Sequence, residues 1–323
     1  MLPPMRVLVT GATGFLGGVV ARRLTQDGHT VTGTGRDPAA GERLRASGVN
    51  FVSAELRRPE QWEGLLDGAD VVIHSAARST LWGRWEDFVA DNVTVSARLA
   101  QACARRGLVL VHVSTPSVYN ATGHHVQVPE SLPVGPRFDS LYARSKFMAE
   151  EAVRLAHPAA VVLRPRGLYG PGDTALVPRL ARALRTGRLP RLTRGEVWTE
   201  LTHVDNAAHA AALALAHPVP GLFNVTDGEA VPLWATLDRL ADRLGVPRPR
   251  RYVPPALLEG AAAVLETLAR LHPQRPEPPL TASGVRLLTR PMSLDLTRAR
   301  TRLGYVPPVQ PGAGLDDVLR RLP

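Results

Sequence analysis

The 323-residue sequence predicts an α/β fold, in which a doubly wound parallel sheet carries a smaller, mostly helical C-terminal lobe. In its first half, short β-branched runs alternate with amphipathic helical stretches, a pattern typical of parallel strands covered by helices. A glycine-rich turn joins the first strand to the first helix. After Pro171 the alternation loosens, and the C-terminal third becomes rich in Pro and Ala.

The periodicity of apolar residues places the individual elements along the chain. We expect strands at Arg6–Thr10, Thr30–Thr34, Val71–His74, Val109–Ser114 and Val161–Arg164, and a later one at Gly221–Val225. We expect helices at Gly14–Asp27, Phe88–Arg105, Tyr142–Ala156, Leu176–Arg185, Val204–Ala216, Leu233–Leu244 and Pro255–Leu271. Residues 1–171 and about 196–228 are assigned to the sheet domain, and residues 172–195 and 229–323 to the smaller lobe.

The composition, 44% hydrophobic and 21% charged, is that of a globular protein. No apolar run reaches membrane-spanning length and no signal-peptide pattern begins the chain, so we expect a cytoplasmic protein without stable membrane insertion. The net charge is +10, but the arginines are dispersed, and we expect no nucleic-acid partner. One arginine run indicates either a solvated face or contact with an anionic part of a substrate or partner: Arg179, Arg182, Arg185, Arg188, Arg191 and Arg194.

The glycine-rich turn after the first strand predicts a dinucleotide cofactor. Gly11, Gly14 and Gly17 lie between a strand and a helix, which is the context that this pattern requires. Glycine allows the backbone to approach a pyrophosphate, which the positive N-terminus of the next helix stabilises. We expect the cofactor contacts of this segment at Gly11, Thr13, Gly14, Phe15, Leu16 and Gly17.

The end of the second strand distinguishes NADP from NAD. NAD enzymes usually carry Asp or Glu there to bind the ribose 2′-hydroxyl, but this chain has Gly35 followed by Arg36. Arg36 suits a 2′-phosphate, whereas Asp37 lies one or two positions late. We therefore predict NADP as the cofactor, with NAD as the alternative if Arg36 is only a solvated loop residue.

Lys146 is the only lysine in the chain, since every other basic side chain is arginine. It lies four residues after Tyr142, and this spacing puts both side chains on one face of a helix. An ammonium beside a phenol lowers the pKa of the phenol, which suits proton transfer. Hydroxyl groups also follow Val109–Ser114, at the carboxyl end of a parallel strand where such sheets bind ligands.

With these motifs the chain resembles the extended short-chain dehydrogenase/reductases of the NAD-dependent epimerase/dehydratase superfamily. The resemblance spans most of the chain. It includes DVVIHSAA at residues 70–77, DNV at 91–93, RPRGLYGPG at 164–172 and HVDN at 203–206. It implies that the sheet domain is an NADP-binding Rossmann domain and that the smaller lobe binds the substrate.

The resemblance also implies three catalytic residues. Tyr142 would be the general acid in carbonyl reduction and the base in alcohol oxidation. Lys146 would bind the nicotinamide ribose and lower the pKa of Tyr142. Thr115 would hydrogen-bond the substrate oxygen, with Ser114 and Ser117 as rivals. The remaining cofactor-binding residues would be Ala76, Ala77 and Pro165, together with Tyr142 and Lys146, while Asn92 would support the active-site architecture.

Two departures disfavour a sugar-nucleotide enzyme. Gly167 stands where such enzymes commonly carry an Asn that contacts the nucleotide diphosphate, and Gly35–Arg36 favours NADP where they usually employ NAD. The C-terminal sequences GLFNVTDG and LGYVP resemble those of the 3β-hydroxysteroid dehydrogenase branch. We expect hydride transfer between NADP(H) and a ketone or secondary alcohol. A nucleotide-sugar epimerase or dehydratase is the alternative, and a redox-sensing or assembly protein that binds the dinucleotide without turnover is a third.

The predicted substrate is small and hydrophobic. Trp82 and Trp85 would either overhang the nicotinamide or pack between the lobes. The segment Pro255–Leu271 has an apolar side that would be core or pocket wall, made of Leu258, Ala261, Leu265 and Leu268. No residues occur at metal-ligand spacing, so no metal is expected. A homodimer is compatible with the sequence.

Overall fold

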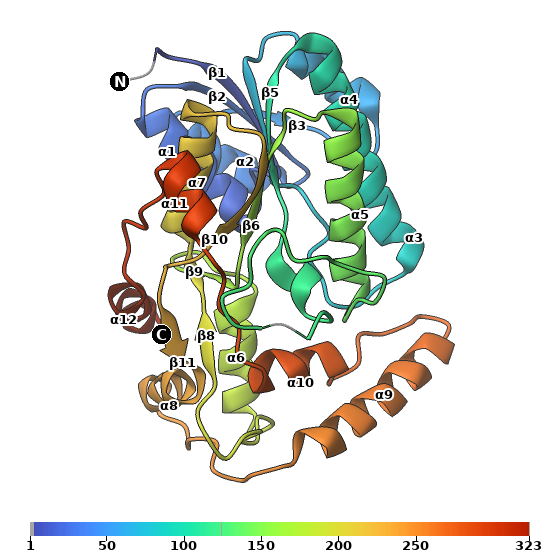
Figure 1. Cartoon of the computed structure of the whole chain (residues 1–323), viewed down its shortest axis with the longest axis vertical. Helices are drawn as coiled ribbons and strands as arrows, with labels where there is room; N and C mark the ends of the chain where they lie inside the picture. Colours follow the sequence, from blue (N-terminus) through green and yellow to red (C-terminus); the bar gives the residue numbers. More distant parts are fainter. Residues whose placement is uncertain (1–2, 124, 323) are drawn as a thin grey trace.

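Figure 1 shows the computed structural model, in which a central sheet is covered by helices and a smaller helical lobe lies at one end. The structure describes residues 3–123 and 125–322. Met1 and Leu2, at the start of the predicted sheet domain, and Pro323, at the end of the predicted lobe, lie outside the described residues.

The main sheet has seven strands in the order β10-β6-β5-β4-β1-β2-β3, and every neighbouring pair is parallel. The strands are β1 (Arg6–Thr10), β2 (Thr30–Gly35), β3 (Asn50–Ser53), β4 (Val71–His74), β5 (Val109–Val113), β6 (Val161–Pro165) and β10 (Gly221–Val225). The chain builds outward from β1 in one direction and then from β4 in the other. The predicted doubly wound sheet is confirmed, and ligands bind such sheets where the order reverses, at the carboxyl ends of the strands.

Helices cover both faces of the sheet. Helices α1 (Phe15–Gln26) and α7 (Val204–Ala216) lie on one face, and α4 (Val95–Arg106) and α5 (Leu141–Ala156) on the other (Figure 1). Side chains alternate along β1, so Val7 and Val9 join the core under α1 and α7 while Leu8 joins the core under α4 and α5. Both cores hold the carboxyl ends of the central strands in place.

The predicted helix Phe88–Arg105 is present and contains a π-helical turn. It runs without a break from α3 (Trp85–Phe88) through the π-helical turn at Val89–Thr94 into α4. The extra residue in a π turn changes the direction of side chains locally, and such turns are frequent at functional sites. Asn92 lies in this turn and is completely buried. Apolar periodicity predicted the helix but contained no signal for the turn.

The remaining elements are short. Between the main strands lie α2 (Pro38–Arg45) and 3-10 turns at Pro59–Gln61, Glu63–Leu66 and Pro116–Tyr119. Two small sheets follow, β7 (Leu168–Tyr169) with β9 (Thr202–His203), and β8 (Trp198–Glu200) with β11 (Ala230–Pro232). The later helices are α6 (Leu176–Arg185), α8 (Leu233–Arg243), α9 (Pro255–Leu271), α10 (Ala282–Thr289), α11 (Thr297–Leu303) and α12 (Pro311–Arg321). Within the described residues, no helix has the length and apolarity needed to span a bilayer.

Helix α9 packs mainly against α10, at the edge of the lobe (Figure 1). Its fully buried side chains are only Ala262 and Ala269. The predicted apolar side is therefore partly wrong, because Ala261 and Leu268 are exposed. The helix exposes four large apolar side chains, Leu257, Val264, Leu268 and Leu271.

Candidate active site

The glycine-rich turn lies at the carboxyl end of β1. Gly11 has φ +71°, and a Cβ there would lie 2.7 Å from the Ala76 amide nitrogen. A Cβ at Gly17 would lie 2.3 Å from the Gly11 carbonyl oxygen, so neither position accepts a side chain. Gly14 precedes α1 without a side chain to cap it, which leaves N–H groups of the first turn available. These features fit the binding of a pyrophosphate.

The end of β2 excludes an acidic side chain at Gly35. A Cβ at Gly35 would lie 2.3 Å from Thr13 Oγ1. The Asp37 carboxylate caps α2 by accepting hydrogen bonds from the amides of Ala39 and Ala40, at 2.9 and 3.1 Å. It therefore has a structural partner already.

Arg36, between these two residues, is 72% exposed, and its Nη1 lies 3.5 Å from Glu55 Oε2. The guanidinium lies beyond the end of β2, where most of it is accessible to solvent. Its neighbour Glu55 comes from the segment that follows β3. One cation and one carboxylate therefore lie beside the position where the adenosine ribose is expected.

The Thr115 hydroxyl lies close enough to the Tyr142 phenol to influence its pKa. Thr115 follows β5, and its Oγ1 lies 3.0 Å from Ser117 Oγ and accepts from the Ser117 amide at 3.2 Å. Burial raises the pKa of Tyr142 to about 12, and the nearby Thr115 hydroxyl offsets part of this rise. The Tyr142 phenol is therefore protonated at neutral pH and able to donate a proton.

Lys146 lies one helical turn after Tyr142 on α5. Its Nζ donates to the Val113 carbonyl at 2.7 Å and lies 3.4 Å from His112 Nε2. Only 1% of the side chain is exposed. Burial lowers the pKa of Lys146 to about 8, and the Glu150 carboxylate acts in the opposite direction. The ammonium thus loses its proton far more easily than a solvated lysine does.

Beneath the site lies a buried ion pair between Glu150 and Arg164, with side chains 1% and 2% exposed. Ser114 donates to the Glu150 carboxylate, and Arg164 donates to it and to the Tyr119 hydroxyl. The Ser114 hydroxyl is therefore engaged in this network. Sequence reasoning missed Glu150, although its spacing of four residues from Lys146 put it on the same helical face.

Asn92 connects the cofactor side of the site to α5. Its Oδ1 accepts from the Arg78 amide at 2.7 Å, and its Nδ2 donates to Ser145 Oγ at 2.9 Å. The segment just before Arg78 carries Ala76, which packs against Gly11, and Ala77, which is exposed. The π-helical turn thereby fixes this segment against the helix of Tyr142 and Lys146.

The other predicted cofactor residues lie at the same edge of the sheet. Phe15 and Leu16 begin α1, and Pro165 is buried at the end of β6. The carboxyl ends of β1, β4, β5 and β6 therefore bring together segments that are far apart in sequence.

His112 was not anticipated, although it stands in the apolar strand β5 with the same side-chain direction as Ser114. Its ring lies 5.3 Å from that of His74, between centroids. His74 contacts Thr10 Oγ1 at 2.7 Å and Ser96 Oγ at 2.9 Å, and burial lowers its pKa to about 3. Both imidazoles are neutral at pH 7, because burial and the charge of Lys146 lower the pKa of His112 as well. Across residues 3–123 and 125–322, no cluster of metal-ligating side chains occurs.

The two tryptophans make packing contacts. Arg144 lies over the ring of Trp85, 4.5 Å from its centroid. Trp82 Nε1 donates to the Arg275 carbonyl at 3.0 Å, and Arg270 of α9 lies over its ring. Trp82 therefore ties the segment after β4 to the end of α9.

The arginine run does not form one surface. Arg179 pairs with Glu277 at 3.2 Å and Arg191 pairs with Asp238 at 3.4 Å. Arg194 lies over the Tyr252 ring. The remaining members are exposed to solvent: Arg182, Arg185 and Arg188.

Residues 7–226 match the model of the NAD dependent epimerase/dehydratase family. The chain belongs to this family. It is 34% identical to a 2-alkyl-3-oxoalkanoate reductase of Stenotrophomonas maltophilia (strain K279a), with 98% of each chain covered. It is 30% identical to isoform 1 of a 3beta-hydroxysteroid-dehydrogenase/decarboxylase of Arabidopsis thaliana, with 84% of this chain and 67% of the relative covered.

Among solved structures, the chain is similar to UDP-glucuronic acid 4-epimerase from Bacillus cereus in complex with NAD. The TM-score is 0.75 at 22% identity, with 98% of each chain covered, which shows the shared fold. The predicted family, fold and enzyme class are confirmed. The chain is a nicotinamide-dependent oxidoreductase that acts on CH–OH or keto groups.

Proposed function

We propose that this enzyme transfers a hydride between NADP(H) and a hydrophobic ketone or secondary alcohol. The observation that carries the proposal is the grouping of three side chains: Thr115 after β5, Tyr142 on α5, and buried Lys146 one helical turn further along α5. This group stands at the edge of the sheet that also holds the glycine-rich turn. A proton donor, a second hydroxyl and a tunable cation therefore lie beside the place that fits the cofactor.

In reduction, the substrate carbonyl oxygen would accept hydrogen bonds from Thr115 and Tyr142, which polarise the carbonyl. The cofactor, when bound, supplies the hydride to the carbonyl carbon. Tyr142 then gives its proton to the oxygen, which yields the alcohol and leaves a phenolate. We assign the Lys146 ammonium to the nicotinamide ribose hydroxyls and to stabilising that phenolate. Oxidation of the alcohol follows the same path in reverse.

The preference for NADP is supported by the end of β2. Gly35 has no room for an acid, Asp37 is used as a helix cap, and Arg36 is exposed. We expect Arg36→Ala to raise KM for NADPH about tenfold or more, because a charged hydrogen bond to the 2′-phosphate is lost, and to leave KM for NADH nearly unchanged. Arg43→Ala, at an exposed position on α2, is the matched control. An unchanged ratio of the two KM values in Arg36→Ala would contradict the assignment of Arg36 to the 2′-phosphate.

The hydrophobic substrate is supported by the exposed apolar side chains of α9 and by the named substrates of the relatives, an alkylated oxoalkanoate and a hydroxysteroid. Gly167 disfavours a sugar-nucleotide substrate, because sugar-nucleotide enzymes commonly carry Asn at this position. With glycine there, the position offers no side-chain amide to a nucleotide diphosphate. We assign NADP binding to residues 1–171 and about 196–228, and substrate binding to residues 172–195 and 229–323.

The test is a spectrophotometric assay at about 340 nm with NADPH and a panel of bulky ketones. The proposal expects NADPH consumption with the ketones, and neither turnover nor thermal stabilisation with UDP- or dTDP-sugars. Tyr142→Phe removes only the hydroxyl, and we expect it to lower kcat by about 100-fold or more. Conversion of a sugar nucleotide without net NADPH consumption would favour an epimerase instead.

A further inference from the structure

The ring of His112 contacts Lys146, and the mechanism proposed above does not use it. His112 belongs to β5 and is completely buried. Its Nε2 lies 3.4 Å from the Lys146 Nζ, which also donates to the Val113 carbonyl at 2.7 Å. Two consecutive residues of β5 therefore contact the Nζ, one through its side chain and one through its backbone.

The second ring nitrogen of His112 is not engaged. Its Nδ1 is buried and has no hydrogen-bond partner in the part of the chain that the structure describes. The hydrogen bond at one ring nitrogen of a histidine decides which of the two nitrogens carries the proton. For His112, Lys146 supplies the only such contact among the described residues, so the state of Lys146 decides the tautomer.

The neighbouring histidine has different partners. His74 of β4 pairs in register with His112 of β5. Both of its ring nitrogens contact hydroxyl groups, those of Thr10 and Ser96. A hydroxyl can donate or accept, so His74 is satisfied in either tautomer without Lys146. Of the two imidazoles, His112 alone has a tautomer that depends on the lysine.

A neutral imidazole can bind both protonation states of a lysine. An ammonium only donates, so Nε2 accepts from it and the ring proton is on Nδ1. An amine has a lone pair, so Nε2 can carry the proton and donate it to the amine. Between the first state and the second, one proton and one positive charge leave the pair. His112 is neutral in both, because burial and the charge of Lys146 hold its pKa well below the ordinary value.

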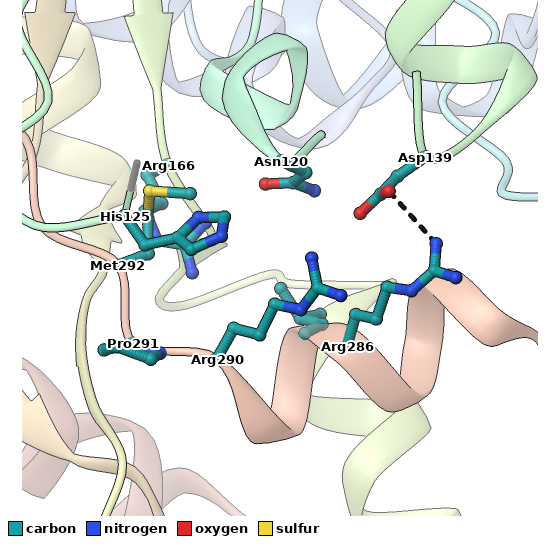
Figure 2. Close-up of a pocket in the computed structure, with 9 residues that line it drawn as sticks. Asn120, His125, Asp139, Arg166, Arg286, Arg290, Pro291 and Met292 are labelled. Atoms are coloured by element: carbon teal, nitrogen blue, oxygen red, sulfur yellow. Dashed lines mark hydrogen bonds and ion pairs between the residues drawn. The ribbon is translucent and has the colours of Figure 1, made fainter. Parts of the chain in front are cut away.

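Few charged groups surround this pair. Glu150 of α5 is the carboxylate that acts on Lys146, and it is shared with Arg164 of β6. The other titratable groups beside the pair are neutral at pH 7: Tyr142 of α5 and His74 of β4. Figure 2 shows Arg286 of α10 directed to Asp139, in a hollow whose lining does not include Lys146. The protonation of Lys146 is therefore expected to depend on Glu150 and on His112.

We propose that His112 is a positioning residue for Lys146. Its ring accepts from the ammonium and, once Lys146 has lost a proton, donates to the amine, so that the Nζ keeps its place in both states. Lys146 thereby stays directed toward the cofactor ribose while its charge changes. This inference rests on the proposed function and adds a supporting residue to it.

The single lysine allows a test that needs no activity assay. In protein labelled with 13C-lysine, Lys146 gives the one Cε signal, and the change of its shift with pH reports the titration of the Nζ. His112→Phe keeps a buried ring but removes the acceptor from the charged form. We expect the pKa of Lys146 to fall by about one unit or more in this variant. His112→Gln, whose amide can accept and donate, should restore at least about half of that fall.

His157→Phe is the matched control. It also removes a buried imidazole, one whose Nε2 contacts the Leu108 carbonyl at 2.9 Å, and it should leave the titration of Lys146 unchanged. A pKa of Lys146 that is the same in His112→Phe as in the wild type would overturn the proposal. So would a His112→Gln variant that shifts this pKa as far as His112→Phe does, because the position would then only pack.

A second measurement uses the wild type alone. In protein labelled with 15N-histidine, the ring of His112 is assigned through its contact with the labelled Lys146 side chain. We expect it to change from Nδ1–H to Nε2–H with the same midpoint as the Lys146 signal. A tautomer that stays constant through this titration overturns the proposal, whether or not the variants fold.

The pH profile of kcat/KM for NADPH separates this inference from the proposed function. In His112→Phe its fall with rising pH should move down with the pKa of Lys146. A profile that stays in place while this pKa moves would contradict the proposed role of Lys146 and leave its contact with His112 standing. If no ketone is reduced at all, the proposed function fails, and the two titrations still decide whether His112 positions the Nζ.

Discussion

The buried ion pair under the active site yields a quantitative prediction for Glu150→Gln. Glu150 accepts hydrogen bonds from Ser114 and from two nitrogens of Arg164, and at most 2% of either charged side chain is exposed. The substitution keeps the shape but removes the charge, so Arg164 remains buried without a counterion. Breaking a buried pair in this way costs about 3–5 kcal/mol. We expect the free energy of unfolding to fall by this amount, measured by urea denaturation.

The adjacent residue provides the control. Glu151 pairs with Arg154 at 3.0 Å, but both side chains are about half exposed, and such surface pairs contribute roughly 0–1 kcal/mol. Glu151→Gln carries the same chemical change on the same helix. If the two variants lose equal stability, within about 1 kcal/mol, the buried pair stabilises the protein no more than the surface pair does.

Two further predictions concern Lys146. Its pKa of about 8 means that the ammonium is present below this pH and lost above it. The kcat/KM for NADPH should therefore fall as pH rises through about 8, and in Glu150→Gln this fall should move to lower pH; a flat profile to pH ~10 would contradict it. Lys146→Arg should lower kcat by about 100-fold or more although it retains the charge, and circular dichroism would verify that the variant is folded. Near wild-type kcat in that variant would refute the role of the lysine.

The local signals along the chain were strong enough to predict most of the fold. Helices α6, α7 and α9 begin and end where apolar periodicity placed them, and so does β10. The strands β7, β8, β9 and β11 were not predicted, because two or three residues show no periodicity, and β3 was missed although it is as long as β4. The buried side of α9 was predicted partly wrongly for another reason. Which side of an amphipathic helix is buried depends on its neighbour, and α9 has mainly α10.

Those parts of the candidate site could be predicted in which the chemistry allows only one type of residue. The glycine-rich turn and the Tyr142–Lys146 spacing each have a local pattern, so they were visible in the sequence. The supporting residues have no such pattern, because their partners come from distant segments. Glu150 reaches Arg164 of β6, and Arg166 shares a hollow with Arg290, 124 positions away in the numbering. Only the packed structure brings these groups together.

The surroundings of Lys146 explain why this position carries lysine in a chain whose other cationic side chains are nearly all arginine. The acceptors at its Nζ are one backbone carbonyl, that of Val113, and the neutral imidazole of His112. An ammonium has three donors, of which two are directed to these groups, and the third would bind the cofactor hydroxyl that we propose as its ligand. A guanidinium would bring five donors in a rigid plane into the same enclosed space, and it cannot lose its charge when donors stay unpaired. Both hydrogen bonding and the proposed proton chemistry therefore favour lysine over arginine at this position.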